Sequence, residues 1–265
     1  MSEDSFEIYA IKYARLSRRS PENFVGGDAH DTEMPLNYYV WVIAGPQRTI
    51  LVDTGFGEAV GRKRGRQIIR PVAEGLGALG IVPEKVEDVI ITHMHYDHAG
   101  NLPLFPKARF HLQDQEMDFA TGRSMRHAML RHGYEAGDVA HMVHCVFDER
   151  VEFHDGAAEI APGIEVHHIG GHTKGMQSVR VRTRRGWVVL ASDASHFYAH
   201  MEQGRAFPIL YNLHDMLAGH DTLRRLATSR NHIVPGHDPL VMERYPAARA
   251  GTEDWIARLD AEPKL

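Results

Sequence analysis

The sequence has almost no cysteine, no long apolar run and no excess of positive charge. Its single cysteine, Cys145, excludes an intramolecular disulfide and fits a reducing compartment. The longest apolar runs, such as WVVLA at 187–191, are too short to span a bilayer, and the polar N-terminus has no signal-peptide pattern. The net charge of -5 gives no general attraction to nucleic acid or to anionic membranes. We therefore expect a cytoplasmic protein that binds neither.

Strand-like segments recur along the whole chain. Runs rich in apolar, β-branched and aromatic residues predict strands at 6–16, 36–43, 49–53, 86–92, 108–113, 151–155, 158–170, 176–183, 186–193 and 232–238. No proline- or serine-rich linker interrupts the series, so we expect one domain over residues 1–265.

Four segments between or after these strands are predicted to be helical. Apolar residues spaced three or four apart fit an amphipathic helix within residues 58–80. Residues 113–147 consist largely of helix-forming residues interrupted by glycines. This pattern predicts a helical insertion over one edge of a sheet. Further helices are expected at residues 212–229 and after residue 238.

Two pairs of segments resemble each other within the chain. TILVDTG (49–55) and VVLASDAS (188–195) are both apolar strands that end in aspartate and a turn. VIITHMHYDH (89–98) and HHIGGHTKG (167–175) both deliver histidine to a loop. Two similar halves, each a sheet backed by helices, predict an α/β fold with four layers, an αββα sandwich.

Histidine is abundant, with 19 residues, and it is concentrated in THMHYDHAGN at 92–101. In an extended segment His93 and His95 point the same way, while Asp97 and His98 lie past a bend. Packing four such groups together without a metal costs desolvation with no compensating gain. The segment therefore predicts a metal site at the end of a buried strand.

Three further candidate ligands also follow strands. His172 comes after EVHHIGG, Asp193 after WVVLAS and His237 after HIVPG. Strand ends converge on one edge of a sheet, so we expect these residues to meet the first four. Five imidazoles and two carboxylates are too many for one tetrahedral ion, which predicts two divalent ions. Seven of the other histidines are interpreted as surface or hydrogen-bonded core residues: His111, His127, His132, His141, His144, His154 and His232.

On these residues the chain resembles the metallo-β-lactamase superfamily over about residues 36–240. The motifs are THMHYDHAGN, GGHTKG, SDAS and VPGHD. The resemblance implies the αββα fold and a dinuclear centre, usually of zinc. It implies that one ion is held by His93, His95 and His172, that the second is held by Asp97, His98 and His237, and that Asp193 bridges them. It also implies that Asp53 of LVDTG braces the ligand loop without binding metal.

Within the superfamily the chain looks most like the N-acyl-homoserine lactonases and related small-lactone hydrolases. This implies that a hydroxide bridging the two ions opens the ester of a lactone, and that Asp97 or His196 passes a proton to the leaving oxygen. Those lactonases usually carry a tyrosine three residues after the bridging aspartate, where this chain has His196. That departure favours another lactone, such as a catabolic one. By analogy with related lactonases, a homodimer is expected.

Other interpretations of the sequence remain open. The same site fits a thioesterase or a phosphodiesterase, and a non-enzymatic protein can keep the fold. Four aromatic residues are candidates for the substrate pocket: Phe197, Tyr198, Phe207 and Tyr211. The basic segment RKRGRQIIR at 62–70 is interpreted as a solvated face, or else as a patch that attracts an anionic substrate such as a carboxylated lactone.

Overall fold

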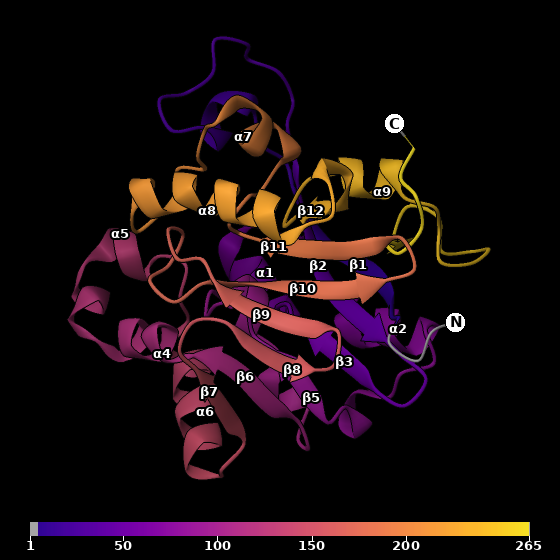
Figure 1. Cartoon of the computed structure of the whole chain (residues 1–265). Coiled ribbons are helices and arrows are strands. Elements are labelled where there is room, and N and C mark those ends of the chain that lie inside the picture. Colours follow the sequence, from indigo (N-terminus) through magenta and orange to yellow (C-terminus); the bar gives the residue numbers. More distant parts are fainter. Residues whose placement is uncertain (1–4, 265) are drawn as a thin grey trace.

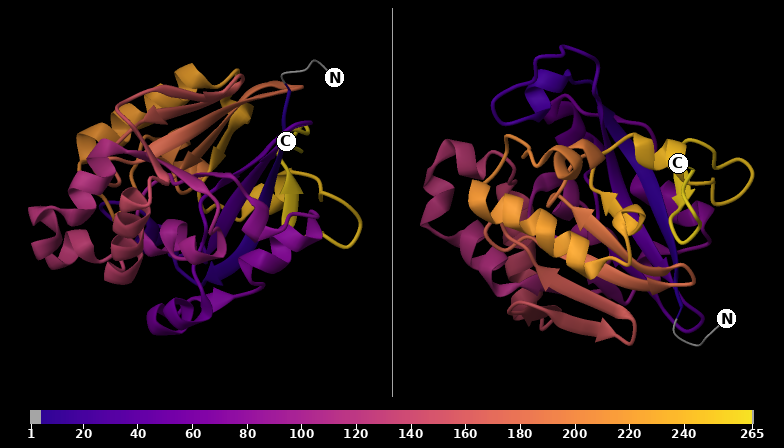
Figure 2. Two further views of the ribbon diagram at one scale, coloured as in Figure 1. Left: turned by 90° about the horizontal axis from the view of Figure 1, so that it is seen from below. Right: turned by 45° about the horizontal axis from the view of Figure 1, so that its top comes forward.

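Two β-sheets pack face to face in the computed structural model, which describes residues 5–264, and helices lie on their outer faces (Figures 1 and 2). This is the mixed α/β arrangement expected from the sequence. The ends of the expected domain, residues 1–4 and 265, lie outside the described residues, and the single domain stays a prediction.

The larger sheet has the strand order β13-β1-β2-β3-β5-β6-β7, with β4 paired to β1. Its strands are β1 (Glu7–Leu16), β2 (Leu36–Ala44), β3 (Thr49–Val52), β4 (Gln67–Ile68), β5 (Asp88–Ile90), β6 (Arg109–Gln113), β7 (Val151–His154) and β13 (Ile256–Arg258). The pairs from β13 to β3 are antiparallel, and those from β3 to β7 are parallel.

The smaller sheet has the order β12-β11-β10-β9-β8. Its strands are β8 (Ala158–Ala161), β9 (Ile164–His168), β10 (Gln177–Thr183), β11 (Gly186–Ser192) and β12 (Ile233–Pro235). Only the β11–β12 pair is parallel. Because β11 and β12 run the same way, both deliver the residues that follow them to one end of this sheet.

Strand β2 shows why the larger sheet lies inside the protein. Its alternate residues Val40 and Val42 belong to the core beneath the outer helices, whereas Tyr39, Trp41 and Ile43 belong to the core between the sheets. All five side chains are buried. A strand that is apolar on both faces needs cover on both faces, which the second sheet and the helices supply.

The helices are α1 (Glu58–Arg64), α2 (Val72–Ala78), α3 (Tyr96–Ala99), α4 (Asp114–Thr121), α5 (Ala128–Arg131), α6 (Ala136–Phe147), α7 (Tyr198–Gln203), α8 (Leu213–Leu226) and α9 (Leu240–Arg244). Helix α8 runs along the outside of the smaller sheet and packs on β11, while α2 packs on β1 (Figure 1). Helices α4, α5 and α6 occupy the segment expected to be a helical insertion, and α6 packs on edge strand β7. Within residues 5–264, no helix has the length and apolar character needed to cross a membrane.

The structure corrects three expectations. Residues 58–80 form α1, β4 and α2 rather than one helix, because Gly65 ends α1 in the left-handed conformation and Pro71 precedes α2. Residues 158–170 form the hairpin β8–β9 instead of a single strand. After residue 238, the short helix α9 is followed by β13, a three-residue strand that is stabilised by pairing with β1.

Candidate metal centre

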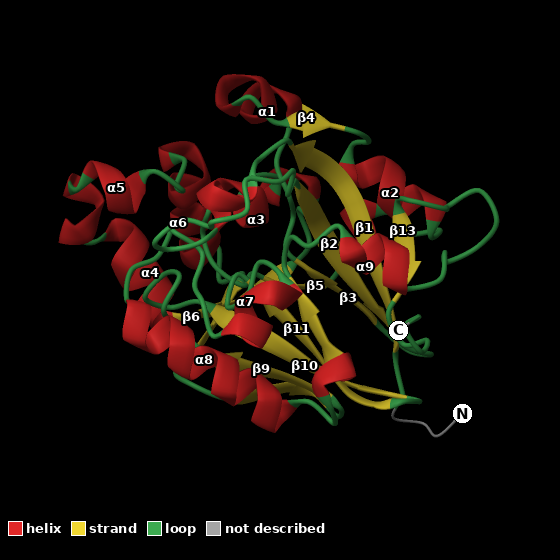
Figure 3. Cartoon of the chain, turned by 90° about the horizontal axis from the view of Figure 1, so that it is seen from above, coloured by secondary structure: helices red, strands yellow, loops and turns green. Residues whose placement is uncertain are grey.

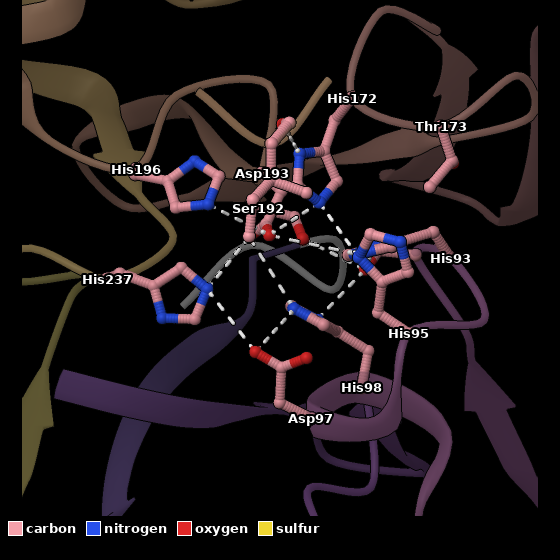
Figure 4. A network of polar contacts seen from close by, with 12 residues as sticks. His93, His95, Asp97, His98, His172, Thr173, Ser192, Asp193, His196 and His237 are labelled. Carbon is pink, nitrogen blue, oxygen red and sulfur yellow. Dashed lines mark hydrogen bonds and ion pairs between the residues drawn. The ribbon is translucent and has the colours of Figure 1, made fainter. Parts of the chain in front are cut away.

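The seven expected ligands come together where strands of both sheets end. His93 and His95 follow β5, and Asp97 and His98 lie in α3. The remaining three are His172 after β9, Asp193 after β11 and His237 after β12. In the view from above, α3 and α7 lie near the middle of the molecule (Figure 3). The close-up shows the seven side chains pointing toward one another (Figure 4).

Their ligand atoms fall into compact groups. One group contains His93, His95, His172 and Asp193, and another contains Asp97, His98 and His237. Within each group the ligand atoms lie within 4.8 Å of one another. A third group joins Asp193 and His237 to His196, so His196 also faces the cluster. All these residues are buried.

Hydrogen bonds on the outer side fix how two of the imidazoles face the cluster. His172 Nδ1 donates to the carbonyl oxygen of Ile209 at 2.8 Å, and His237 Nδ1 donates to that of Asn37 at 2.8 Å. Since a carbonyl only accepts, Nδ1 carries a proton, and Nε2 holds a lone pair when the ring is neutral. Both Nε2 atoms are thereby oriented as metal ligands.

These lone pairs face the oxygens of Asp193. His172 Nε2 lies 3.1 Å from Oδ2 and His237 Nε2 lies 3.0 Å from Oδ1. His93 Nε2 and His98 Nε2 are buried and have no hydrogen-bond partner among the described residues. Nitrogen lone pairs directed at a carboxylate repel it unless a proton or a metal cation lies between them. Burial lowers the pKa of His237, but the Asp193 carboxylate outweighs it and raises that pKa, so a positive charge is favoured at this point. The residues present therefore fit a bound divalent cation.

The pKa values of the cluster residues shift in both directions. Burial, reinforced by neighbouring histidines, holds the pKa of His93 well below its usual value. Burial acts in the same direction on His98, but the carboxylates of Asp193 and Asp53 outweigh it and raise its pKa well above the usual value. Burial alone would raise the pKa of Asp193, yet the surrounding imidazoles hold it well below the usual value. An ionised carboxylate among imidazoles is a ligand set typical of zinc.

Asp53 lies directly behind the ligand loop. Its carboxylate accepts hydrogen bonds from His98 Nδ1 at 2.7 Å, from the Thr92 backbone N–H at 2.7 Å and from Thr92 Oγ1 at 2.9 Å. Thr92 Oγ1 also lies 2.9 Å from Ser192 Oγ, which links the two halves. Asp53, directly after β3, and Ser192, the last residue of β11, both have positive φ, 63° and 47°, which is a strained conformation.

Glu116 in α4 is a second buried carboxylate at the site, and the sequence did not indicate it. It accepts hydrogen bonds from the Met94 N–H at 2.9 Å, Tyr134 Oη at 2.9 Å, Thr173 Oγ1 at 2.6 Å and the Gly175 N–H at 3.1 Å. Met94 separates the first two histidines, and Thr173 follows the third. Glu116 therefore ties together the two loops that carry these histidines.

His196 lies three residues after Asp193 and faces the cluster. Its Nε2 lies 3.2 Å from Asp193 Oδ2, and its ring stacks on Phe207 with centroids 3.7 Å apart. Its Nδ1 is buried and has no hydrogen-bond partner among residues 5–264. Burial holds the pKa of His196 well below its usual value, so the ring is neutral near neutral pH. His196, Asp97 and Phe207 line one cavity at the cluster.

The other aromatic candidates divide between three places. Tyr211 lines a second, mostly apolar cavity that also contacts the cluster, where it packs on Phe119. Phe197 is buried in the core beneath the outer helices, and Tyr198 lies under Arg244 in a separate cavity. Neither lines the two cavities at the cluster, because helix α7 begins at Tyr198 and turns both side chains away.

The basic residues of the segment 62–70 lie in two different environments. Arg62 and Lys63 have side chains that are 73% and 65% exposed, as a solvated face requires. Arg64 is only 12% exposed, and both Arg64 and Arg66 line the cavity at the cluster together with Arg18. The solvated-face interpretation therefore fails for two residues of the segment.

Comparison with known proteins agrees with a metal-binding cluster at this site. The model of the metallo-beta-lactamase superfamily matches residues 34–237. An N-acyl homoserine lactonase from Bacillus sp. is 26% identical over 179 residues, which cover 62% of this chain and 66% of that protein. The matched stretch is thus just under two thirds of that relative. A probable metallo-hydrolase of Mycobacterium tuberculosis is 26% identical over 231 residues, which cover 76% of this chain and 73% of that protein.

Solved structures share the fold at low identity. A quorum-quenching N-acyl homoserine lactone lactonase superimposes with a TM-score of 0.72 at 22% identity, covering 90% of this chain and 94% of that chain. A probable metal-dependent hydrolase from Staphylococcus aureus gives a TM-score of 0.74 at 15% identity, covering 100% of this chain and 97% of that chain. At these identities the likeness establishes the fold.

Replacing Asp53 by asparagine tests whether this carboxylate orients His98. An amide NH2 cannot accept from His98 Nδ1, so we expect Asp53→Asn to lower metal affinity about 10- to 100-fold while the protein stays folded. Competition with a chromophoric chelator measures the affinity. The exposed Asp155→Asn is the control. Equal affinity in Asp53→Asn and the wild type would show that the carboxylate has no such role.

Gly133→Ala tests how closely the helical insertion packs on the cluster. A Cβ at Gly133 would lie 2.4 Å from the ring of His95, which is buried and cannot move freely. We expect loss of bound metal in this variant, measured by elemental analysis. Gly137→Ala, whose Cβ meets nothing within 4 Å, should bind metal normally. Full metal content in Gly133→Ala would contradict this account of the packing.

Proposed function

The chain belongs to the metallo-β-lactamase superfamily, and from this premise we propose that it is a metal-dependent hydrolase that opens the ester bond of a small lactone. The observation that carries the proposal is the buried cluster of imidazoles around the ionised carboxylate of Asp193, open to a cavity lined by Asp97 and His196. The N-acyl homoserine lactonases among its relatives support a lactone as the substrate class.

In this proposal the cluster holds two divalent ions, of which zinc is the expected identity. His93, His95 and His172 would hold one ion, and Asp97, His98 and His237 would hold the other, with Asp193 available to both. The ions supply Lewis acidity toward the ester carbonyl and toward a water molecule. Asp53 and Glu116 keep the ligand loops in place through the hydrogen bonds they accept.

Two side chains that line the cavity act on the substrate itself. His196 is held by stacking on Phe207, and its neutral ring carries one N–H that donates to the carbonyl oxygen as negative charge develops there. Asp97 lies in α3 beside His98, with 3.6 Å between Asp97 Oδ2 and His98 Nε2. In this proposal Asp97 takes the proton lost by the attacking water and passes it to the ring oxygen that leaves. The cytoplasmic location and the homodimer expected from the sequence stay predictions.

The substrate class is tested with metal-free protein and a panel of esters. Chelation should abolish hydrolysis, and reloading with zinc should restore it. Among lactones, thioesters and phosphodiesters, we expect the largest kcat/KM for a lactone, by roughly tenfold or more, which corresponds to about 1.4 kcal/mol. A higher kcat/KM for a thioester or a phosphodiester would replace the lactonase assignment. Undiminished activity after chelation would refute metal dependence.

His196→Ala separates the donor role from a role in packing. Loss of one donor to the oxyanion lowers kcat by about 100-fold or more, so we expect that loss with unchanged metal content. His196→Tyr, which introduces the residue usual in related lactonases, should retain more activity than His196→Ala. Unchanged kcat/KM in His196→Ala on the best substrate of the panel would exclude the donor role.

A further inference from the structure

Three arginines line the cavity that opens onto the metal-binding cluster. Arg18 follows β1, Arg64 is the last residue of α1, and Arg66 directly precedes β4. The same cavity is lined by Asp97 and His196. A substrate that reaches the cluster through this cavity therefore meets the guanidinium groups of these arginines. It also meets Asp97 and His196, the proposed reacting side chains.

Each guanidinium nitrogen of Arg64 donates a hydrogen bond to a group of the protein. It bonds the carboxylate of Glu135 at 2.8 Å and the carbonyl oxygens of His132 at 2.8 Å and Tyr134 at 3.2 Å. Its guanidinium also lies 4.0 Å from the centre of the Tyr96 ring. These contacts tie α1 to the helical insertion, so we assign Arg64 a positioning role.

Arg18 and Arg66 keep donors that no group within residues 5–264 accepts. Arg66 Nε donates to Tyr96 Oη at 2.9 Å and Nη1 to the Arg64 carbonyl at 2.6 Å, which leaves Nη2. Arg18 Nη2 donates to the Glu22 carbonyl at 2.5 Å, while its Nε is buried and has no partner. No carboxylate in the described part of the chain lies within 4.0 Å of either guanidinium.

Two half-buried cations without a carboxylate in direct contact are costly, because burial disfavours the charged form. Burial lowers the pKa of Arg18 by more than the Glu22 carboxylate raises it, and the positive charge of Arg66 lowers it further. Burial also acts to lower the pKa of Arg66, but Tyr38, Tyr96 and the Asp97 carboxylate outweigh it and raise that pKa. Cations bound at the cluster would add further positive charge nearby. An anion that enters the cavity is the group that would offset these charges.

The second cavity at the cluster has the opposite character. It is lined by Met129, Leu130, Pro208, Leu210 and Tyr211, among others. It shares with the first cavity the histidines His95, His132 and His172. The cluster therefore lies between an apolar side and a cationic side, and an anionic substituent of the substrate would bind on the cationic side.

We propose that Arg18 and Arg66 form an anion subsite that binds a carboxylate of the substrate, so that the substrate is a carboxylated lactone. This inference rests on the proposed lactonase function and specifies its substrate class. A carboxylate has two acceptor oxygens, so it can take one charge-assisted hydrogen bond from Nη2 of Arg66 and another from Arg18. Arg18 is further placed by its contact with Phe207, whose ring centre lies 5.0 Å from the guanidinium.

The first test compares two lactones that differ in one charge: γ-butyrolactone-γ-carboxylate and the corresponding γ-carboxamide. Wild-type protein should prefer the carboxylate. Arg18→Gln and Arg66→Gln should each raise KM for the carboxylate by roughly tenfold, with little change in kcat and little change for the amide. Arg66→Lys, which keeps the charge, should recover part of the loss. Arg62→Gln removes an exposed arginine outside the cavity and should match the wild type.

Equal kcat/KM for the acid and the amide, unaltered by either glutamine variant, would overturn the subsite even if both lactones are hydrolysed. Thermal unfolding checks that each variant is folded. A second readout does not depend on turnover: calorimetric binding of glutarate to the metal-loaded protein, with glutaramide as the neutral counterpart.

The calorimetric measurement keeps the two proposals separate. Glutarate binding that weakens roughly tenfold in Arg18→Gln and Arg66→Gln supports the subsite, even if no lactone is hydrolysed and the proposed function fails. Glutarate affinity that is the same in the wild type and both variants places the carboxylate at the metal ions alone and contradicts the subsite. Tighter arginine-dependent binding of inorganic phosphate than of glutarate would overturn the assignment to a carboxylate.

Discussion

Burial of nitrogen lone pairs against a carboxylate is the constraint on which the rest of this structure depends. The oxygens of Asp193 lie 3.0 and 3.1 Å from imidazole nitrogens of His237 and His172, both oriented by carbonyl groups behind them. With neutral rings such an arrangement is unfavourable until a metal cation lies between nitrogen and oxygen, and binding of the metal displaces any proton held there. The hydrogen bonds that His172 Nδ1 and His237 Nδ1 donate fix the orientation of both rings before metal binds. Metal binding therefore needs little rearrangement of the protein.

The fold meets this constraint by bringing two similar halves together at their strand ends. Asp53 and Ser192 adopt strained backbone conformations at corresponding positions after β3 and at the end of β11, and Thr92 bonds to both. The stiffness of two buried sheets stabilises these conformations, which isolated loops would not keep. Glu116 connects the ligand loops to the helical insertion, whose Gly133 lies against His95.

Much of this arrangement could be predicted from local sequence. Each ligand follows an apolar run, and THMHYDHAGN carries four of them, so the pattern predicts where strands end and which side chains meet. Glu116 could not be found in this way, because its four donors come from segments distant in sequence and its own neighbours have no distinctive pattern. The sequence predicts Tyr198 in the substrate pocket, but the direction of its side chain depends on the residue at which α7 begins, which the sequence pattern does not reveal. Strand β13 is too short to be recognised without its partner β1.

Crystals grown with zinc and measured on both sides of the zinc absorption edge test the central claim most directly. The account predicts two anomalous difference peaks, one among His93, His95 and His172 and the other among Asp97, His98 and His237, each within about 2.0–2.2 Å of the ligand atoms. Absence of anomalous density at these side chains, with the protein folded as described, would contradict the account.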